Sequence, residues 1–192
     1  MEFNLSEEQN ILKDQVRSLA ERELAAGALE RAHSGDYPWD VAELLARNGL
    51  MGITIDPEDG GQGGTMTDAV IAIEQIASVC PRSADVIQAG NFGAIRVLAQ
   101  FATPSQKERL LKPLLAGKEI VSVAMTEGDA GSAVTELTTS ATPDGDGYIV
   151  NGSKVFTTHG VHATMFLVYV RFGPGLGGIG SVAGAAVGAL LI

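Results

Sequence analysis

The feature of this sequence that most constrains its fold is a change in hydrophobic period near residue 118. Before that point, apolar residues recur every three or four positions, as they do in amphipathic helices. Beyond it, short apolar runs alternate with polar residues and turn signals, as they do in strands. We therefore predict an α+β fold, in which an all-helical domain over residues 1–118 precedes an antiparallel β domain over residues 119–192.

Start and stop signals divide the first part into helices. Ser6–Gln9 and Thr103–Gln106 have the pattern of capping boxes, with a hydroxyl residue three positions before a glutamine. Glycine just beyond an apolar periodic run indicates a helix end. Further helices are expected from Pro38 to Asn48-Gly49, from about Thr67 to Cys80 and from about Ser83 to Phe101, the last interrupted by Gly90 and Gly93, and the helix after Thr103 is expected to stop at Gly117.

The second part reads as short strands joined by turns. Pro143–Gly147 is rich in turn residues, and Asn151-Gly152 is the dipeptide most typical of a two-residue β-hairpin. Each turn is expected to reverse the chain between neighbouring strands. The predicted strands are Ile120–Thr126, Leu137–Thr142, Tyr148–Val150, Lys154–Thr158 and Met165–Val170.

Composition excludes several classes of function. A net charge of -10 argues against a nucleic-acid surface, because phosphate binding needs clustered lysine and arginine. The single cysteine, Cys80, excludes an intramolecular disulfide and is expected to be a buried structural thiol. Residues 1–8 lack the basic and apolar regions of a secretory signal, so we expect a cytoplasmic protein.

Two segments carry the most functional information. Val123–Ser132 is a small apolar strand followed by a loop rich in glycine and hydroxyl residues, and Tyr148–Thr158 ends in Phe-Thr-Thr. Such a surface can hold a flat aromatic heterocycle against apolar side chains. It can also offer hydroxyls and backbone N–H groups to polar edges and to a phosphate. The alternative is an ordinary sheet edge on which Thr126, Thr157 and Thr158 are merely solvated.

The order and spacing of several motifs resemble the N-terminal and middle domains of acyl-CoA dehydrogenases, over most of residues 1–173. The resemblance implies FAD as cofactor and an acyl-CoA thioester as substrate. It also implies α,β-desaturation with hydride transfer to flavin N5, electron-transfer flavoprotein as a possible partner, and a homo-oligomer in the full-length family. The matching stretches are Leu5–Gln9, Gly49–Ile53 with Asp56–Gly61, Met125–Glu127 with Ala130–Ser132, and Gly147–Lys154.

The same resemblance implies a role for individual residues. Thr126 would hydrogen-bond the polar edge of the flavin, Phe156 would pack beside the isoalloxazine, and Thr158 would donate near N5. Gly131 and Ser132 would approach the pyrophosphate, and Ser132 would also contact the acyl-CoA. The implied cofactor-binding residues are Val123, Met125, Thr126, Gly131, Ser132, Phe156, Thr157 and Thr158.

Some positions depart from the family pattern. Gly128, Asp129 and Ala133 stand where the family usually has Pro, often Gly and frequently Asp. The resemblance implies a carboxylate base, usually a Glu, on a C-terminal helical domain. We expect that domain to be missing here, and Glu127 does not match the base. We therefore assign no catalytic residue, and expect a truncated form that binds FAD weakly or not at all and is inactive alone. The alternative is a non-catalytic binding or assembly module derived from the same fold.

The uncharged tail from Phe172 to Ile192 allows other interpretations. It is long enough to span a bilayer, but its many glycines favour a β segment, with a strand at Ile179–Val182 and a truncated or frame-altered end. Gly173–Gly178 satisfies G-x-G-x-x-G, yet the chain ends before a second strand and an acidic residue, so we interpret the match as accidental. His159 and His162 lack further ligands at useful spacing, so no metal site is expected.

Overall fold

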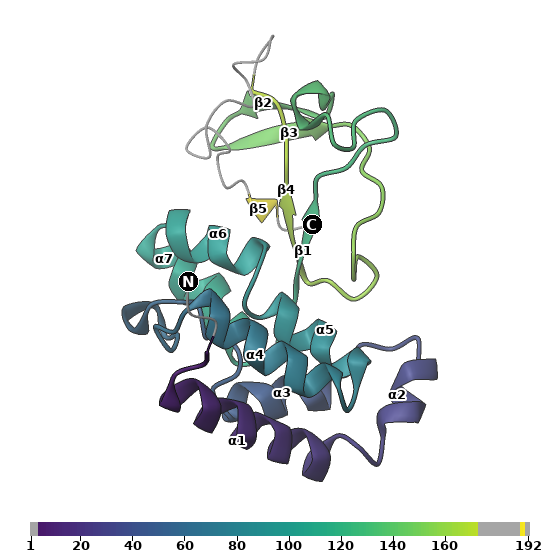
Figure 1. The fold of residues 1–192 in the computed structure, drawn as a ribbon. Coiled ribbons are helices and arrows are strands. Elements are labelled where there is room, and N and C mark those ends of the chain that lie inside the picture. The colour runs from purple at the N-terminus through teal and green to yellow at the C-terminus, as the bar shows by residue number, and fades with distance from the viewer. Residues whose placement is uncertain (1–3, 173–188, 191–192) are drawn as a thin grey trace. The chain divides into compact units, whose positions relative to one another are not determined.

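The chain folds into a helical unit followed by a small sheet unit. The computed structural model describes residues 4–172 and 189–190. The two compact units are Met1–Glu119 and Ile120–Ile192, and the ribbon in Figure 1 shows helices in the first and strands in the second. The predicted α+β class, with helices first, is confirmed.

The helical unit is built from short elements. Helix α5 packs against α2, α3 and α4, and α4 also packs against α1. In this way the longest helix, α1, is joined to the rest of the unit through α4. The elements are α1 (Glu7–Glu23), α2 (Ala28–His33), α3 (Trp39–Arg47), η1 (Pro57–Asp59), α4 (Met66–Ala77), α5 (Pro81–Ala89), α6 (Ala94–Phe101), α7 (Pro104–Gln106), η2 (Lys107–Leu111, a π-helical turn) and α8 (Lys112–Leu115).

Both predicted capping boxes are present. The Ser6 hydroxyl accepts a hydrogen bond from the backbone of Gln9, whose side chain accepts one from the backbone of Ser6, both at 3.2 Å. Thr103 and Gln106 form the same pair of bonds. Each box satisfies backbone N–H groups that the first turn of a helix leaves unpaired. Helix α3 also follows Pro38 and ends at Asn48, as predicted.

The interruption predicted at Gly90 and Gly93 separates two helices. The expected helix from Ser83 to Phe101 is divided into α5 and α6, separated by residues 90–93. The interruption brings Asn91 into the core, where its side-chain oxygen accepts from the backbone of Ile53 and its amide donates to Leu50 and Ile87. The break is therefore stabilised by a fully buried side chain that bonds to helix α5 and to residues 50–53 after α3. Helix α2 was not predicted.

A continuous apolar core fills the helical unit. Cys80 is fully buried and its sulfur accepts a 3.0 Å hydrogen bond from Ser83, so the predicted structural thiol is confirmed. The largest fully buried apolar side chains here come from six different segments, which explains how such short helices hold together. They are Leu24, Val41, Leu45, Ile76, Val86, Ile87, Ile95 and Leu111.

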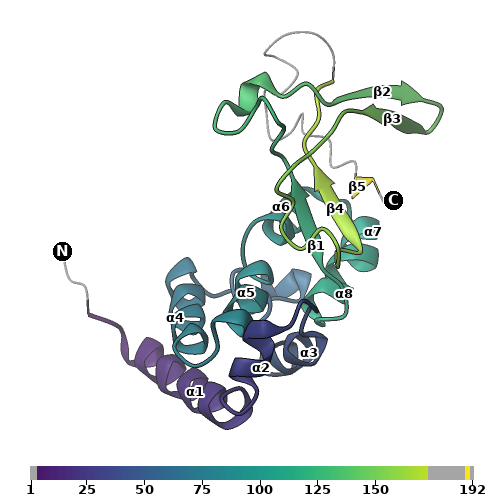
Figure 2. The same cartoon turned by 90° about the vertical axis from the view of Figure 1, so that its right-hand side faces the viewer.

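The sheet unit contains a three-stranded sheet of order β1-β4-β5 and a separate two-stranded hairpin, β2-β3. Figure 2 shows β1 and β4 side by side. A short 3₁₀ turn, η3 (Val134–Glu136), precedes the hairpin. The strands are β1 (Val121–Ala124), β2 (Ser140–Asp144), β3 (Gly147–Asn151), β4 (Met165–Val168) and β5 (Ala189–Leu190).

The expectation of a purely antiparallel sheet is wrong for one pair. Strands β2-β3 and β4-β5 are antiparallel, but β1 and β4 are parallel, with Val121 opposite Met165 and Ala124 opposite Val168. A parallel pair needs a long crossover. The chain provides one, because residues 125–164 contain the hairpin and a further extended segment.

The hairpin predicted at Asn151-Gly152 is not observed. The observed hairpin turns at Gly145-Asp146, where Gly145 has a φ of 56°, as the predicted turn over Pro143–Gly147 requires. Asn151 ends β3, and no strand ladder follows over Lys154–Thr158. Gly152 serves close packing instead, since a Cβ built on it would lie 2.3 Å from the hydroxyl oxygen of Thr139.

The predictions for the tail lie mostly outside the described residues. The expected strand at Ile179–Val182 and the G-x-G-x-x-G match at Gly173–Gly178 both fall there. Ala189–Leu190 pairs with β4 as strand β5. Over residues 4–172 and 189–190, every helix is too short or too polar to cross a bilayer.

Candidate functional site

Strand β1 and the residues after it supply the first part of the predicted site. Ser122 and Ala124 are buried, whereas Val123 is half-buried, as are Met125 and Thr126 beyond the strand. Since β1 stands first in the order β1-β4-β5, it is an edge strand of its sheet. The predicted residues of this segment are therefore accessible from outside the core.

The segment 154–158 lies directly beside β1. The backbone N–H of Val155 donates to the carbonyl of Thr126 at 2.9 Å. The hydroxyl of Ser122 donates to the carbonyl of Thr158 at 2.6 Å. These two bonds show that the segment runs antiparallel to residues 122–126. The fold thus brings two groups of predicted residues together, Val123 with Met125 and Thr126, and Phe156 with Thr157 and Thr158.

Phe156 is the most unusual residue of this pair of segments. Its side chain is 88% exposed, although it is a large aromatic. Its φ of 55° lies in the left-handed region, which costs a residue with a Cβ on the order of 1–2 kcal/mol. Thr158, two residues later, is also exposed. An exposed aromatic held in a strained backbone is typical of a ligand-contacting position.

Gly131 and Ser132 lie in the loop between Glu127 and η3, and both are exposed. The loop begins with a tight turn in which Glu127 and Ala130 exchange backbone hydrogen bonds of 3.0 and 3.3 Å. A Cβ built on Gly131 would meet no atom within 4 Å, so a ligand can approach the backbone closely. Among the described residues, no hydrogen bond joins Gly131 or Ser132 to Thr126 or Thr158.

Glu127 is a residue whose role sequence reasoning missed. Its buried carboxylate accepts from the backbone and hydroxyl of Thr138 at 2.7 and 2.6 Å, from the backbone of Thr139 at 2.8 Å and from Lys154 at 2.8 Å. Burial alone would raise the pKa of Glu127, but the bonds from Lys154, Thr138 and Thr139 outweigh it and hold the pKa well below its usual range. Glu127 is therefore an ionised anchor.

The two histidines belong to a turn that follows the segment 154–158. The backbone N–H groups of His162 and Ala163 both donate to the carbonyl of His159 at 2.9 Å. His159 itself has a φ of 59°. Within the part of the chain that the structure describes, no group of three or more His, Cys, Asp or Glu side chains is placed to hold a metal ion.

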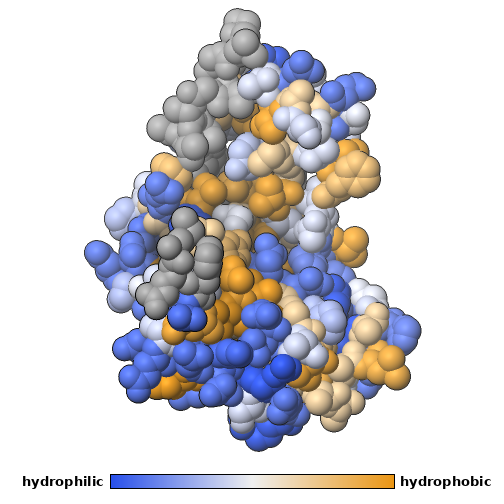
Figure 3. Space-filling model, in the orientation of Figure 1, coloured by the Kyte–Doolittle hydropathy of each residue, from blue (hydrophilic) through white to orange (hydrophobic). Residues whose placement is uncertain are grey.

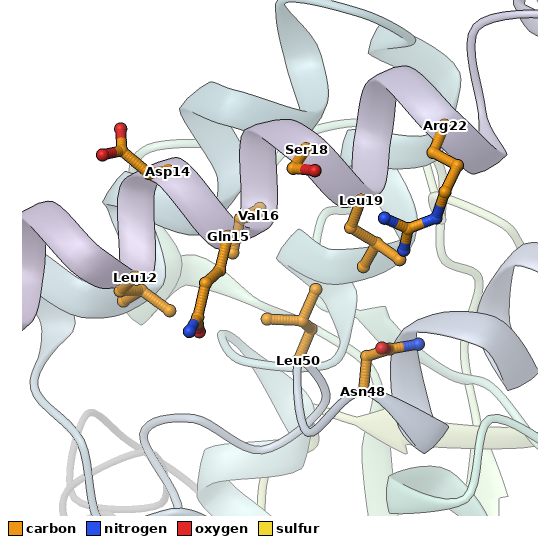
Figure 4. A pocket seen from close by; sticks show the side chains of 9 residues that line it. All are labelled: Leu12, Asp14, Gln15, Val16, Ser18, Leu19, Arg22, Asn48 and Leu50. Atoms are coloured by element: carbon orange, nitrogen blue, oxygen red, sulfur yellow. The ribbon is translucent and has the colours of Figure 1, made fainter.

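The helical unit has a hollow of its own, between α1 and the turn after α3. Its volume is about 530 Å³. Figure 4 shows Leu12 and Leu19 on α1 and Leu50 on the facing turn, with Arg22 and Asn48 at one end. It contains none of the residues predicted from the flavin-like motifs. The sheet unit therefore remains the candidate cofactor site.

The exposed groups of the sheet unit suit a flavin. The two neighbouring segments offer an accessible aromatic ring, Phe156, and two hydroxyls, Thr126 and Thr158. The loop adds the hydroxyl of Ser132 and open space at Gly131. A flat apolar ring with a polar edge and an attached phosphate needs these kinds of partner.

Both units match domains of known proteins. Residues 6–118 match the model of the acyl-CoA dehydrogenase N-terminal domain, and residues 122–187 match that of the middle domain. A 3-sulfinopropanoyl-CoA desulfinase of Variovorax paradoxus is 36% identical over 169 residues, which cover 88% of this chain and 42% of that protein. A short-chain-specific acyl-CoA dehydrogenase of Clostridium acetobutylicum is 32% identical over 169 residues, which cover 88% of this chain and 45% of that protein.

A solved structure supports the same assignment. The structure described as the FAD complex of PigA superposes with a TM-score of 0.84 at 27% sequence identity, covering 92% of this chain and 47% of that one. The chain thus spans less than half the length of the relatives it matches. By these matches, the chain belongs to the acyl-CoA dehydrogenase family and carries the family's N-terminal and middle domains.

Proposed function

We propose that residues 122–127 and 154–158 form the face on which the isoalloxazine of FAD packs, in an α,β-desaturation of an acyl-CoA thioester. FAD, when bound, would accept the hydride that leaves the substrate. The hydrogen bonds from Val155 to Thr126 and from Ser122 to Thr158 carry the proposal, because they bring the two predicted groups of residues into one surface. The family assignment supports the cofactor.

Each side chain of this surface would make a different contact with the flavin. Val123 and Met125 would supply apolar contact, and Phe156 would pack against the edge or face of the ring. Thr126 would donate to the polar edge. The Thr158 hydroxyl would donate near N5, where negative charge develops as the ring is reduced, and a fixed donor there stabilises that charge. Thr157, which is half-buried, would support its neighbours.

The loop after Glu127 would hold the phosphate end of the cofactor. Gly131 leaves the backbone open, and Ser132 offers both an N–H and a hydroxyl. Backbone N–H groups and hydroxyls are common phosphate ligands where lysine and arginine are absent. Ser132 would also contact the acyl-CoA. This assignment does not require the loop to touch Thr126 or Thr158 directly.

We propose that no residue of the described chain acts as the general base of this reaction. Glu127 lies within residues 122–127, but four hydrogen bonds to its carboxylate and a lowered pKa keep it ionised and engaged. A base must be free to take a proton from the substrate. We therefore propose that the chain alone does not turn over. Electron-transfer flavoprotein as acceptor and a homo-oligomer are proposed for the complete enzyme.

The relatives support the substrate class but not one particular reaction. Both are named for acyl-CoA thioesters, one as a desulfinase and one as a short-chain dehydrogenase. The thioester is thus the common feature. Desaturation is the reaction we propose, and enoyl-CoA formation measured with an artificial electron acceptor tests it, with no turnover expected from this chain alone.

Cofactor binding is tested separately by equilibrium dialysis of the purified chain against FAD. We expect the parent chain to bind FAD weakly and saturably. The variants Thr126→Val and Thr158→Val, which each lack one of the two hydroxyls, should lose this binding. Binding that survives both substitutions unchanged would refute the assignment of this surface.

A second candidate, an assembly module, is favoured by exposed apolar side chains on the helical unit. Ile11 on α1 and Met66 and Val70 on α4 are each at least half exposed, at 50%, 55% and 54%. The space-filling view in Figure 3 shows apolar surface over the helices. Exposed apolar patches often mark contacts with other chains. Colourless protein that forms a stable complex through this face would support this candidate over the first.

A further inference from the structure

The segment 154–158 is held to β1 by few contacts. Between Asn151 and Thr158 the chain forms no strand ladder, and the left-handed backbone of Phe156 prevents the ladder of β3 from continuing. Only the bonds from Val155 to Thr126 and from Ser122 to Thr158 join the main chain of this segment to residues 122–126. These two bonds stand in place of the repeated pairing that a strand ladder would provide. A further contact at one end of the segment would therefore add to its positioning.

The ion pair between Glu127 and Lys154 stands at the end of this segment. Lys154 Nζ donates to Glu127 Oε1 at 2.8 Å and to the backbone carbonyl of Met125 at 2.9 Å. The two side chains are 10% and 6% exposed. One ammonium group thus bonds to both residues that flank Thr126, and it is carried by the residue next to Val155.

The carboxylate of Glu127 extends the connection to a third segment. Its two oxygens accept four hydrogen bonds, one from Lys154 and the others from Thr138 and Thr139, just before β2. A buried charge costs free energy unless it is paired and hydrogen-bonded, and here both conditions are met. Because the acceptor sites are filled, the carboxylate has one well-defined orientation.

We propose that Glu127 and Lys154 form a clamp that sets the register of residues 154–158 against residues 125–127. In doing so the clamp would position the exposed groups of Phe156 and Thr158 relative to Thr126. Neither residue needs to contact the cofactor, so both are positioning residues. The second part of this inference rests on the proposed FAD-binding function, whereas the first part concerns the protein without cofactor.

Hydrogen exchange at the backbone N–H of Val155, measured without FAD, tests the clamp itself. In Lys154→Met, exchange at Val155 is expected to be about tenfold faster, because the loss of a charge-assisted bond frees the segment. Lys154→Arg keeps the charge and should restore exchange to within about threefold of the parent protein. Thr138→Val leaves the ion pair in place and removes one of the four donors to Glu127, so a smaller increase in the exchange rate at Val155 is expected. This variant provides the test if Lys154→Met does not fold.

The control is Lys107→Met in the helical unit. Lys107 forms an ion pair with Asp59 at 2.6 Å, with side chains 27% and 18% exposed. It resembles the clamp in chemistry but lies in the other unit. This variant should leave exchange at Val155 unchanged. Exchange at Val155 that stays at the parent rate in both Lys154→Met and Thr138→Val would overturn the clamp.

Equilibrium dialysis against FAD then tests the positioning. The dissociation constant of FAD is expected to rise about tenfold in Lys154→Met and not in Lys107→Met. Faster exchange at Val155 with an unchanged FAD affinity would overturn the positioning role while leaving the clamp. If the parent chain does not bind FAD at all, the proposed function fails, and the exchange rates alone decide on the clamp.

Discussion

The hydroxyl of Ser122 donates a 2.6 Å hydrogen bond to the backbone carbonyl of Thr158, which lies 36 positions further along the chain. Ser122 is 2% exposed, so this bond connects the interior of the sheet unit to one of its exposed residues. A buried hydroxyl without a partner is costly, and Thr158 provides that partner. The bond explains why a polar residue occupies a buried position of β1.

Removal of this hydroxyl should weaken cofactor binding. In Ser122→Ala the carbonyl of Thr158 loses a hydrogen bond that is worth about 1 kcal/mol, which corresponds to an approximately fivefold rise in the FAD dissociation constant. Equilibrium dialysis measures this rise. Ser153→Ala changes an exposed serine directly before the segment 154–158 and should have no effect. Equal affinities of the two variants would show that Ser122 does not position Thr158.

Phe156 is expected to lower the stability of the sheet unit and to raise its affinity for FAD. Glycine tolerates a φ of 55° without strain, so Phe156→Gly is expected to stabilise the cofactor-free sheet unit, by up to about 1 kcal/mol after the greater unfolded-state freedom of glycine is counted. The same substitution removes the exposed ring and should lower FAD affinity. Native-state hydrogen exchange gives the stability, and dialysis gives the affinity. A loss of stability with unchanged affinity would contradict the role proposed for the ring.

The sheet unit should lose stability in acid because of Glu127. The pKa of Glu127 is lower in the folded protein than its ordinary value of 4.5, so folding favours the ionised form. This contribution is fully present above the unfolded pKa and is lost as the pH falls through the folded pKa. Glu127→Gln removes it.

Native-state hydrogen exchange of β1 and β4 amides as a function of pH measures this effect. The difference in stability between the parent protein and Glu127→Gln should be largest near neutral pH and should narrow as the pH falls below 4.5. A difference that is independent of pH would mean that the charge of Glu127 does not stabilise the fold.

Asn91 should be essential to the helical unit. It is fully buried and bonds to Ile53, Leu50 and Ile87. Asn91→Ala leaves several buried backbone groups unpaired and is expected to cost about 3 kcal/mol. Urea unfolding followed by the fluorescence of Trp39, the single tryptophan, measures the loss. Asn10→Ala, at an exposed position of α1, should change stability by less than about 0.5 kcal/mol.

Local signals predicted local structure well. Ser6 and Thr103 begin helices as their capping boxes indicated, because each box is formed within four consecutive residues. Asn151-Gly152 misled because two turn signals stand close together, and the preceding Gly145-Asp146 satisfies the strand pairing first. The parallel pairing of β1 with β4 depends on residues about 44 positions apart, as between Val121 and Met165, which no local pattern reveals.

The site was predictable only in part. The motif resemblance gave Thr126 and Thr158 as candidates, and the fold brings their two segments together. It gave no sign of the contact between Glu127 and Lys154, because their 27-residue separation has no periodic signature and Glu127 resembles an ordinary loop carboxylate. Ser122 was missed for a similar reason, since its hydrogen-bond partner is a backbone carbonyl that any residue could provide.

The central claim is that residues 122–127 and 154–158 form one FAD-binding face. Titration of the ¹⁵N-labelled chain with FAD, followed by amide chemical shifts, tests it directly even when binding is weak. The account predicts that the largest shifts fall at Thr126, Gly131, Phe156 and Thr158, and that Leu12, Leu19 and Leu50 around the helical hollow stay unchanged. Shifts centred on that hollow, or no shifts at millimolar FAD, would contradict it.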